Sequence, residues 1–76
     1  MPKQMKQVDG YESLNPEQQN TLESTYSFHL EAMGEHVRVR YSLERIREVR
    51  WNSREQCVEI FFVNGDWWHY LNNTWW

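Results

Sequence analysis

The sequence contains very little cysteine, glycine or proline. Its 76 residues include one cysteine, three glycines and two prolines. Cys57 has no partner within the chain, which excludes an intrachain disulfide and favours a reducing compartment, either the cytoplasm or a virus acting inside it. The glycines are isolated from one another, which excludes a glycine-rich phosphate-binding loop.

Long apolar runs are also missing. No stretch is long enough to span a bilayer, and the amino end, MPKQMKQVDG, lacks the apolar segment of a signal peptide. We therefore expect a cytoplasmic protein with no membrane partner. A chain of this length forms one small domain and buries only about 60% of the surface that it exposes when unfolded. Large aromatic side chains, or a partner, must then supply much of the stabilising burial.

Residues with catalytic or metal-binding chemistry are few and poorly spaced. His29, His36 and His69 show no C-x2-C or H-x3-H ligand spacing with one another or with Cys57, and the predicted strands place them on different faces. Cys57 has no neighbouring base in sequence that would activate it as a nucleophile. We therefore predict no metal site, no cofactor and no enzymatic activity.

Arginine is concentrated in one part of the chain. Residues 36–54 hold six arginines and two glutamates, a net charge of +4, although the whole chain has a net charge of −3. Arginine binds carboxylates and phosphates through a planar fork and stacks on aromatic rings. The simplest interpretation is an exposed strand face on which these arginines pair with nearby glutamates.

The first half of the chain changes character near Leu22. Residues 1–21 are polar, contain both prolines and show no periodicity, so we expect a flexible polar arm followed by a single small β domain at 22–76. Apolar and polar residues then alternate over 22–31 and again over 36–41. This alternation predicts two strands that form a hairpin.

The second half predicts a meander of three further strands. They are expected at 47–52, 57–63 and 66–71, after a short helical turn near 43–46. Parity pairs Trp51 with Val58 and Val49 with Ile60. The fold class is therefore mainly β, an antiparallel meander of about five strands, with a small α+β fold as the alternative.

Asn64-Gly65 predicts a two-residue type I′ turn, because both central residues of such a turn need positive φ. This turn pairs Phe62 with Trp67 and Phe61 with Trp68. The two faces of the hairpin then carry Val58, Ile60, Phe62, Trp67, His69 and Leu71 on one side, and Phe61, Val63, Trp68 and Tyr70 on the other. Both faces are aromatic, and the pattern leaves open which lies inside. The remaining face must be covered by the arm, by Trp75-Trp76, by a second subunit or by a partner.

Part of this meander resembles a known family. The run Ile46-x2-Val49-x-Trp51-Asn52, followed by Val58-x-Ile60-x-Phe62-x2-Gly65-x2-Trp68-x-Tyr70, is similar to the β-meander of KTSC domains, small domains that occur alone and beside lysyl-tRNA synthetases. The resemblance covers residues 46–70. It implies a binding module with a connection to RNA, and it transfers no catalytic residue.

These features favour a non-enzymatic binding module, because aromatic residues and arginine carry much of the energy of protein interfaces. We predict that the protein docks on a larger protein as an inhibitor or adaptor, in the manner of small phage accessory proteins. The candidate contact residues are Phe61, Trp68, Tyr70, Trp75, Trp76, Arg38, Arg40, Arg45, Arg47 and Arg50. One alternative is single-stranded nucleic-acid (RNA) binding by stacking on the aromatic face, which the negative net charge disfavours. The other is a homodimer in which two such faces cover each other.

Overall fold

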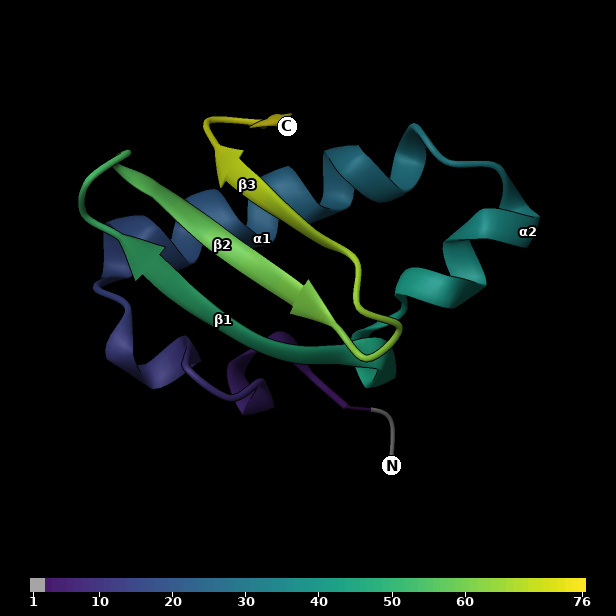
Figure 1. The fold of residues 1–76 in the computed structure, drawn as a ribbon, viewed down its shortest axis with the longest axis horizontal. Coiled ribbons are helices and arrows are strands. Elements are labelled where there is room, and N and C mark those ends of the chain that lie inside the picture. The colour runs from purple at the N-terminus through teal and green to yellow at the C-terminus, as the bar shows by residue number, and fades with distance from the viewer. Residues whose placement is uncertain (1–2) are drawn as a thin grey trace.

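The protein has a small α+β fold with one four-stranded antiparallel sheet (Figure 1). Its structure is a computed structural model that describes residues 3–76. The helical elements come first: η1 (Met5–Gln7), η2 (Tyr11–Ser13), α1 (Pro16–Glu31), α2 (Glu35–Arg38), η3 (Val39–Tyr41) and η4 (Leu43–Arg45), where η denotes a 3-10 turn. The strands follow: β1 (Ile46–Asn52), β2 (Cys57–Phe62), β3 (Trp67–Leu71) and β4 (Thr74–Trp75). Among the described residues, no helix combines the length and the apolar character needed to cross a bilayer.

The meander expected in the second half of the chain is present. Strands β1, β2 and β3 differ from the predicted ranges by one residue at one end, and neighbouring strands pair in chain order. The pairings of Val49 with Ile60 and of Trp51 with Val58 are as predicted. The turn η4 likewise confirms the short helical turn near 43–46. Local alternation was sufficient here, because each strand pairs with its neighbour in sequence.

The predicted pairing between β2 and β3 is wrong by one residue. Phe61 pairs with Trp67, and Ile60 pairs with Trp68. A shift of one residue moves every side chain of a strand to the other face of the sheet. Trp68 and Tyr70 therefore share a face with Ile60, whereas Trp67 and His69 lie on the opposite face.

The turn chemistry explains this shift. A type I′ turn needs positive φ at both Asn64 and Gly65, but only Gly65 has it, at 94°. The Gly65 amide donates to the Phe62 carbonyl over 3.0 Å, and the Phe62 amide donates to the Asp66 carbonyl over 2.9 Å. The loop therefore holds three residues, with glycine in the left-handed position, and β3 begins one residue later than a two-residue loop would allow.

A turn with two positive φ angles occurs instead between β3 and β4. Asn72 and Asn73 have φ of 47° and 66°, as a type I′ hairpin turn requires. Helix α1 holds this turn in place, because the Asn72 amide donates to Thr21 Oγ1 over 2.8 Å and the Asn73 amide donates to Thr25 Oγ1 over 2.9 Å. The Ser24 hydroxyl also donates to the Asn73 side chain.

The strand expected at 22–31 is wrong, because these residues belong to α1. Asn15 caps the helix and Pro16 occupies its first turn. The Asn15 side chain accepts from the Gln18 amide over 2.8 Å, and the Gln18 side chain accepts from the Asn15 amide over 2.9 Å. The buried residues of the helix are Leu22, Thr25, Tyr26 and His29. Their spacing is that of one helix face, and it packs against the sheet.

The second strand of that predicted hairpin, at 36–41, is also wrong. These residues form α2 and η3, which carry the chain from α1 to β1 (Figure 1). Val37 and Val39, expected to face the first strand, are 42% and 66% exposed. The correct class is therefore α+β with four strands, because α1 supplies the cover for the sheet that a further hairpin was expected to supply.

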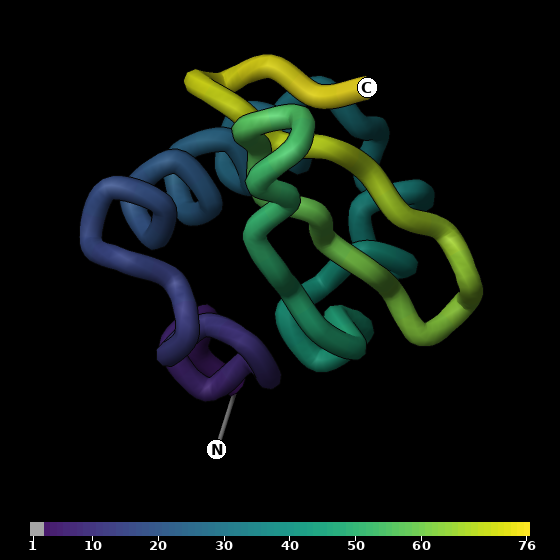
Figure 2. Tube along the Cα trace, turned by 60° about the vertical axis from the view of Figure 1, so that its left-hand side comes forward, coloured from purple at the N-terminus to yellow at the C-terminus, as the bar shows by residue number. Residues whose placement is uncertain are grey.

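The amino-terminal segment is packed against the sheet and does not form the flexible arm expected for residues 1–21. The first two residues of that range lie outside the described part. Met5, Val8 and Leu14 are buried, and the Val49 amide of β1 donates to the Asp9 carbonyl over 2.9 Å. Figure 2 shows this segment, in purple, leading up into α1 beside the sheet. These three buried apolar residues are spaced irregularly in a segment that is otherwise polar. They therefore produce no helix or strand periodicity in the sequence.

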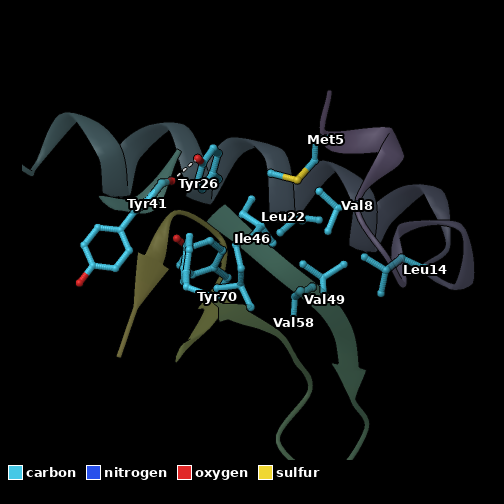
Figure 3. Close-up of a cluster of buried hydrophobic side chains, with 12 residues drawn as sticks. Met5, Val8, Leu14, Leu22, Tyr26, Tyr41, Ile46, Val49, Val58 and Tyr70 are labelled. Atoms are coloured by element: carbon cyan, nitrogen blue, oxygen red, sulfur yellow. Dashed lines mark hydrogen bonds between the residues drawn. The ribbon is translucent and has the colours of Figure 1, made fainter. Parts of the chain in front are cut away.

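The core lies between α1, the amino-terminal segment and the inner face of the sheet (Figure 3). We use "inner face" for the side of the sheet that α1 covers. The core residues are Met5, Val8, Leu14, Leu22, Tyr26, Tyr41, Ile46, Val49, Val58, Ile60, Phe62 and Tyr70. The Tyr26 hydroxyl donates to the Tyr41 carbonyl, and burial raises the pKa of Tyr26 to about 12. Burial also raises the pKa of Tyr70, whose hydroxyl lies 2.6 Å from His29 Nδ1. Tyr26 of α1 and Tyr70 of β3 thus remain uncharged and hydrogen-bonded in the core.

His29 makes the stability of the fold sensitive to acid. It is 5% exposed, and burial lowers its pKa from the ordinary value near 6.5. The unfolded chain therefore binds more protons than the folded chain as the pH falls through about 6.5. This contribution is fully present above that pH and is lost as the pH falls towards the lower, folded-state pKa. We expect urea denaturation to show a smaller loss of unfolding free energy between about pH 7 and pH 5 for His29→Gln than for the native chain. An unchanged pH slope would contradict this role.

Candidate functional site

The side of the sheet opposite α1, the outer face, carries a continuous row of aromatic rings. Phe61 stacks on Trp67 with ring centroids 5.6 Å apart, and Trp67 meets the edge of His69 at 4.9 Å. His69 in turn stacks on Trp76 at 5.1 Å with an interplanar angle of 10°. Four rings from β2, β3 and the end of the chain thus form one strip across the sheet, which we call the aromatic strip.

The aromatic strip is exposed to solvent. Trp67 is 48% exposed and Trp76 is 52% exposed. In Figure 1, α1 lies behind the sheet, and among residues 3–76 no element covers the side that faces the viewer. The two tryptophans therefore present large apolar surface to solvent, and each stacks on a neighbouring ring of the strip.

Two arginines of β1 lie over one end of the aromatic strip. The Arg50 guanidinium is 4.5 Å from the centroid of the Phe61 ring, and that of Arg47 is 5.8 Å away. Each also forms an ion pair on this face, Arg47 with Glu48 at 3.6 Å and Arg50 with Glu59 at 3.5 Å. The positive charge at this end is therefore already matched by carboxylates.

A cluster of polar side chains lies at the other end of the aromatic strip. His69 Nε2 lies 2.9 Å from Glu55 Oε2 and 3.9 Å from Glu59 Oε2. The Asn52 amide group donates to both carboxylates, over 3.3 and 3.1 Å. Beneath them the Cys57 thiol is fully buried, and its pKa is raised by burial and by the negative charges of Glu55 and Glu59. This thiol is therefore protonated at neutral pH and is a poor nucleophile.

The predicted aromatic contact residues divide between the two faces. Phe61 and Trp76 belong to the aromatic strip. Tyr70 is fully buried on the inner face, and Trp68 is half-buried there against Tyr41, with ring centroids 5.1 Å apart. Trp75 stacks on the buried His29 at 4.6 Å, so it closes the end of the core. The terminal pair of tryptophans thus straddles the sheet, with one ring on each side.

The predicted arginines divide in the same way. Arg47 and Arg50 lie on the outer face, whereas Arg38 and Arg40 lie on α2 and η3, away from it. Arg38 donates to the Met33 carbonyl over 3.1 Å. Arg45 is exposed at the end of η4, where its carbonyl accepts from the Val63 amide over 2.8 Å. The structure therefore reduces the predicted basic face to two arginines.

Trp67 and His69 are the site residues that sequence reasoning missed. Both were predicted on the strand face opposite Phe61, because the assumed turn set the wrong register. The sequence did contain a usable signal, since Val63-Asn64-Gly65 also fits a three-residue loop with glycine in the left-handed position.

The outer face combines aromatic and arginine side chains in one exposed area. It presents stacked aromatic rings and ion-paired arginines, and its cysteine is protonated and buried. Trp, Tyr and Arg are the residue types that most often dominate interface energetics. Comparison of the chain with protein-family models, with curated proteins and with solved structures gives no match.

Proposed function

We propose that this protein is a small, non-enzymatic binding module whose outer face docks on a larger protein as an inhibitor or adaptor. The observation that carries the proposal is the aromatic strip, in which two tryptophans about half exposed stack on Phe61 and His69. A side chain that already stacks on a neighbour in the free protein loses less conformational entropy on binding, so more of its burial appears as affinity. The partner surface that fits is an apolar patch on a folded protein.

The charge pattern favours a protein over a nucleic acid. Arg47 and Arg50 are paired with Glu48 and Glu59, and Glu55 adds a further carboxylate to the same face. A polyanion would meet more carboxylates than free cations here, whereas single-stranded nucleic-acid sites combine stacking rings with a positive groove. The resemblance of residues 46–70 to KTSC domains, and with it the connection to RNA, stays a prediction.

The compartment that suits this function is the cytoplasm. Cys57 is a free, buried thiol, and a reducing environment would keep it in that form. A phage-type accessory protein acting on a bacterial target would meet the same conditions.

Replacing Trp67 tests the proposal. A partner isolated on the immobilised protein should bind Trp67→Ala about 30-fold more weakly or worse, because a central interface tryptophan typically contributes 2 kcal/mol or more by truncation. Phe28→Ala is the matched control, since Phe28 is an aromatic residue of similar exposure, 50%, on α1 and away from the sheet's outer face. The dissociation constants are measured by calorimetry, and circular dichroism verifies both folds.

Three results would overturn the proposal. A partner that binds Trp67→Ala as tightly as the native chain does not use the outer face. Light scattering that shows a dimer of the native chain and a monomer of Trp67→Ala makes a second copy the occupant. Salt-sensitive quenching of tryptophan fluorescence by a mixed oligonucleotide, lost in Trp67→Ala, makes the occupant a nucleic acid.

A further inference from the structure

Four side chains with metal-binding chemistry meet at the end of the β2–β3 hairpin. Cys57 and Glu59 alternate along β2, so they project to the same side of the sheet, and Glu55 precedes them in the turn between β1 and β2. His69 is the cross-strand neighbour of Glu59. No linear ligand motif contains these residues, because the register of the hairpin, and not sequence spacing, brings them together.

The donor atoms are already close to one another. One ligand atom each from Glu55, Cys57 and His69 lie within 4.8 Å of one another. Glu59 lies outside this group of three, but one of its carboxylate oxygens is 3.9 Å from His69 Nε2, which makes it the candidate for a fourth donor. Ligand atoms of a tetrahedral zinc site are about 3.5 Å apart when the bonds are 2.0–2.3 Å long. Glu55 can close the difference, because its side chain is 50% exposed and lies in the loop before β2.

The groups around these donors support ligation. His69 Nδ1 lies 3.4 Å from the Trp76 carbonyl, the kind of outer partner that directs the other ring nitrogen, Nε2, to a cation. Asn52 holds both carboxylates on the side of His69. The Cys57 thiol is fully buried and has no hydrogen-bond partner among the described residues, although its sulfur lies beside this cluster. A buried, unpartnered ligand atom next to an imidazole and two carboxylates is the feature that a bound cation would explain.

We propose that Glu55, Cys57, Glu59 and His69 bind a divalent transition-metal ion of the zinc type at the outer end of the β2–β3 hairpin. The donor set of one thiolate, one imidazole and two carboxylates suits Zn²⁺ or Co²⁺ and is unsuited to Mg²⁺ or Ca²⁺, which prefer oxygen ligands alone. Binding displaces the thiol proton to solvent, and three negative ligands then surround the two positive charges of the ion. The site shares His69 with the aromatic strip, but metal binding does not depend on the proposed protein binding.

Cobalt provides the direct test. We expect the full chain, kept reduced by a phosphine, to bind one Co²⁺ and to develop the thiolate-to-cobalt charge-transfer band together with the intense visible bands of a tetrahedral ion. Zn²⁺ should then displace the cobalt and remove both signals. Cys57→Ser should lose the charge-transfer band, and His69→Gln should weaken Zn²⁺ binding at least about 100-fold, the upper range for disturbing a metal site through its supporting groups.

Two variants separate ligation from folding. Glu55→Gln changes an exposed side chain and should weaken Zn²⁺ binding by about 10-fold or more with an unchanged circular dichroism spectrum. Glu48→Gln is the matched control, because Glu48 is a carboxylate of the same sheet face that pairs with Arg47 and lies outside the cluster. The proposal is overturned if the native chain shows no cobalt spectrum at excess Co²⁺. It also fails if Cys57→Ser retains the charge-transfer band, or if Glu55→Gln binds Zn²⁺ as tightly as Glu48→Gln.

Discussion

A Gly10→Ala variant is expected to lose at least about 3 kcal/mol of unfolding free energy, more than any other glycine replacement in this chain. Gly10 has a φ of +93°, and a Cβ at this position would lie 1.9 Å from the Val49 carbonyl oxygen of β1. The left-handed conformation alone costs alanine roughly 1–2 kcal/mol. The clash adds to this cost, because it must displace the amino-terminal segment from β1. This displacement breaks the hydrogen bond from the Val49 amide to the Asp9 carbonyl, worth about 1 kcal/mol.

The three glycines form a graded series that isolates the cause. Gly65 has a φ of +94° but open space around its Cβ position, so Gly65→Ala should cost only the conformational strain, roughly 1–2 kcal/mol. Gly34 has negative φ and no atom within 4 Å of its Cβ position, so Gly34→Ala should change stability by less than about 0.5 kcal/mol. Urea denaturation measures all three. Equal stability of the Gly10→Ala and Gly34→Ala variants would mean that the amino-terminal segment is not packed on β1.

Leu22→Ala should destabilise the fold by about 2–5 kcal/mol, the range for truncating a fully buried leucine. Leu22 has no exposed surface and belongs to the face that α1 packs against the sheet. Its loss leaves a cavity between the helix and the strands. We expect the loss to appear as a lower urea midpoint with an unchanged m-value, because the folded and unfolded states otherwise keep their exposed surface.

Phe28→Ala is the comparison that makes the Leu22 result decisive. A strand at 22–31 would place Leu22 and Phe28 on the same face, whereas α1 buries Leu22 and leaves Phe28 50% exposed. The helix therefore predicts a cost below about 1 kcal/mol for Phe28→Ala, although the side chain removed is larger. Comparable losses for the two variants would contradict the helical packing.

The helix escaped detection because its buried face contains polar residues. Leu22 and Tyr26 fit both the alternation of a strand and the periodicity of a helix. The choice between strand and helix therefore depended on the residues between and beyond them. The helical face is completed by Thr25 and His29, which are buried because Thr25 binds the Asn73 amide and His29 meets the Tyr70 hydroxyl. No sequence pattern reveals those partners, since they lie more than 40 residues away in the chain. The capping signal at Asn15-Pro16 with Gln18 was the local evidence for a helix start.

The sequence predicted the types of residue in the candidate site but not which individual residues belong to it. The sequence indicated aromatic and arginine residues on a sheet, and Phe61, Trp76, Arg47 and Arg50 do lie together on the outer face. A one-residue difference in loop length then exchanged Trp68 and Tyr70 for their neighbours Trp67 and His69. The same register places His69 beside Glu55 and over Cys57, so the metal site that we propose was equally hidden.

The sequence by itself determined the meander, because alternation and pairing between neighbouring strands are local properties of β1, β2 and β3. It also determined that aromatic surface would exceed what one core can enclose. Only the tertiary structure decided which rings are buried, because that depends on the conformation of Gly65 and on α1 covering one face of the sheet. It also decided that the amino-terminal segment belongs to the core, since the close approach of Gly10 to Val49 is a contact between residues far apart in the chain.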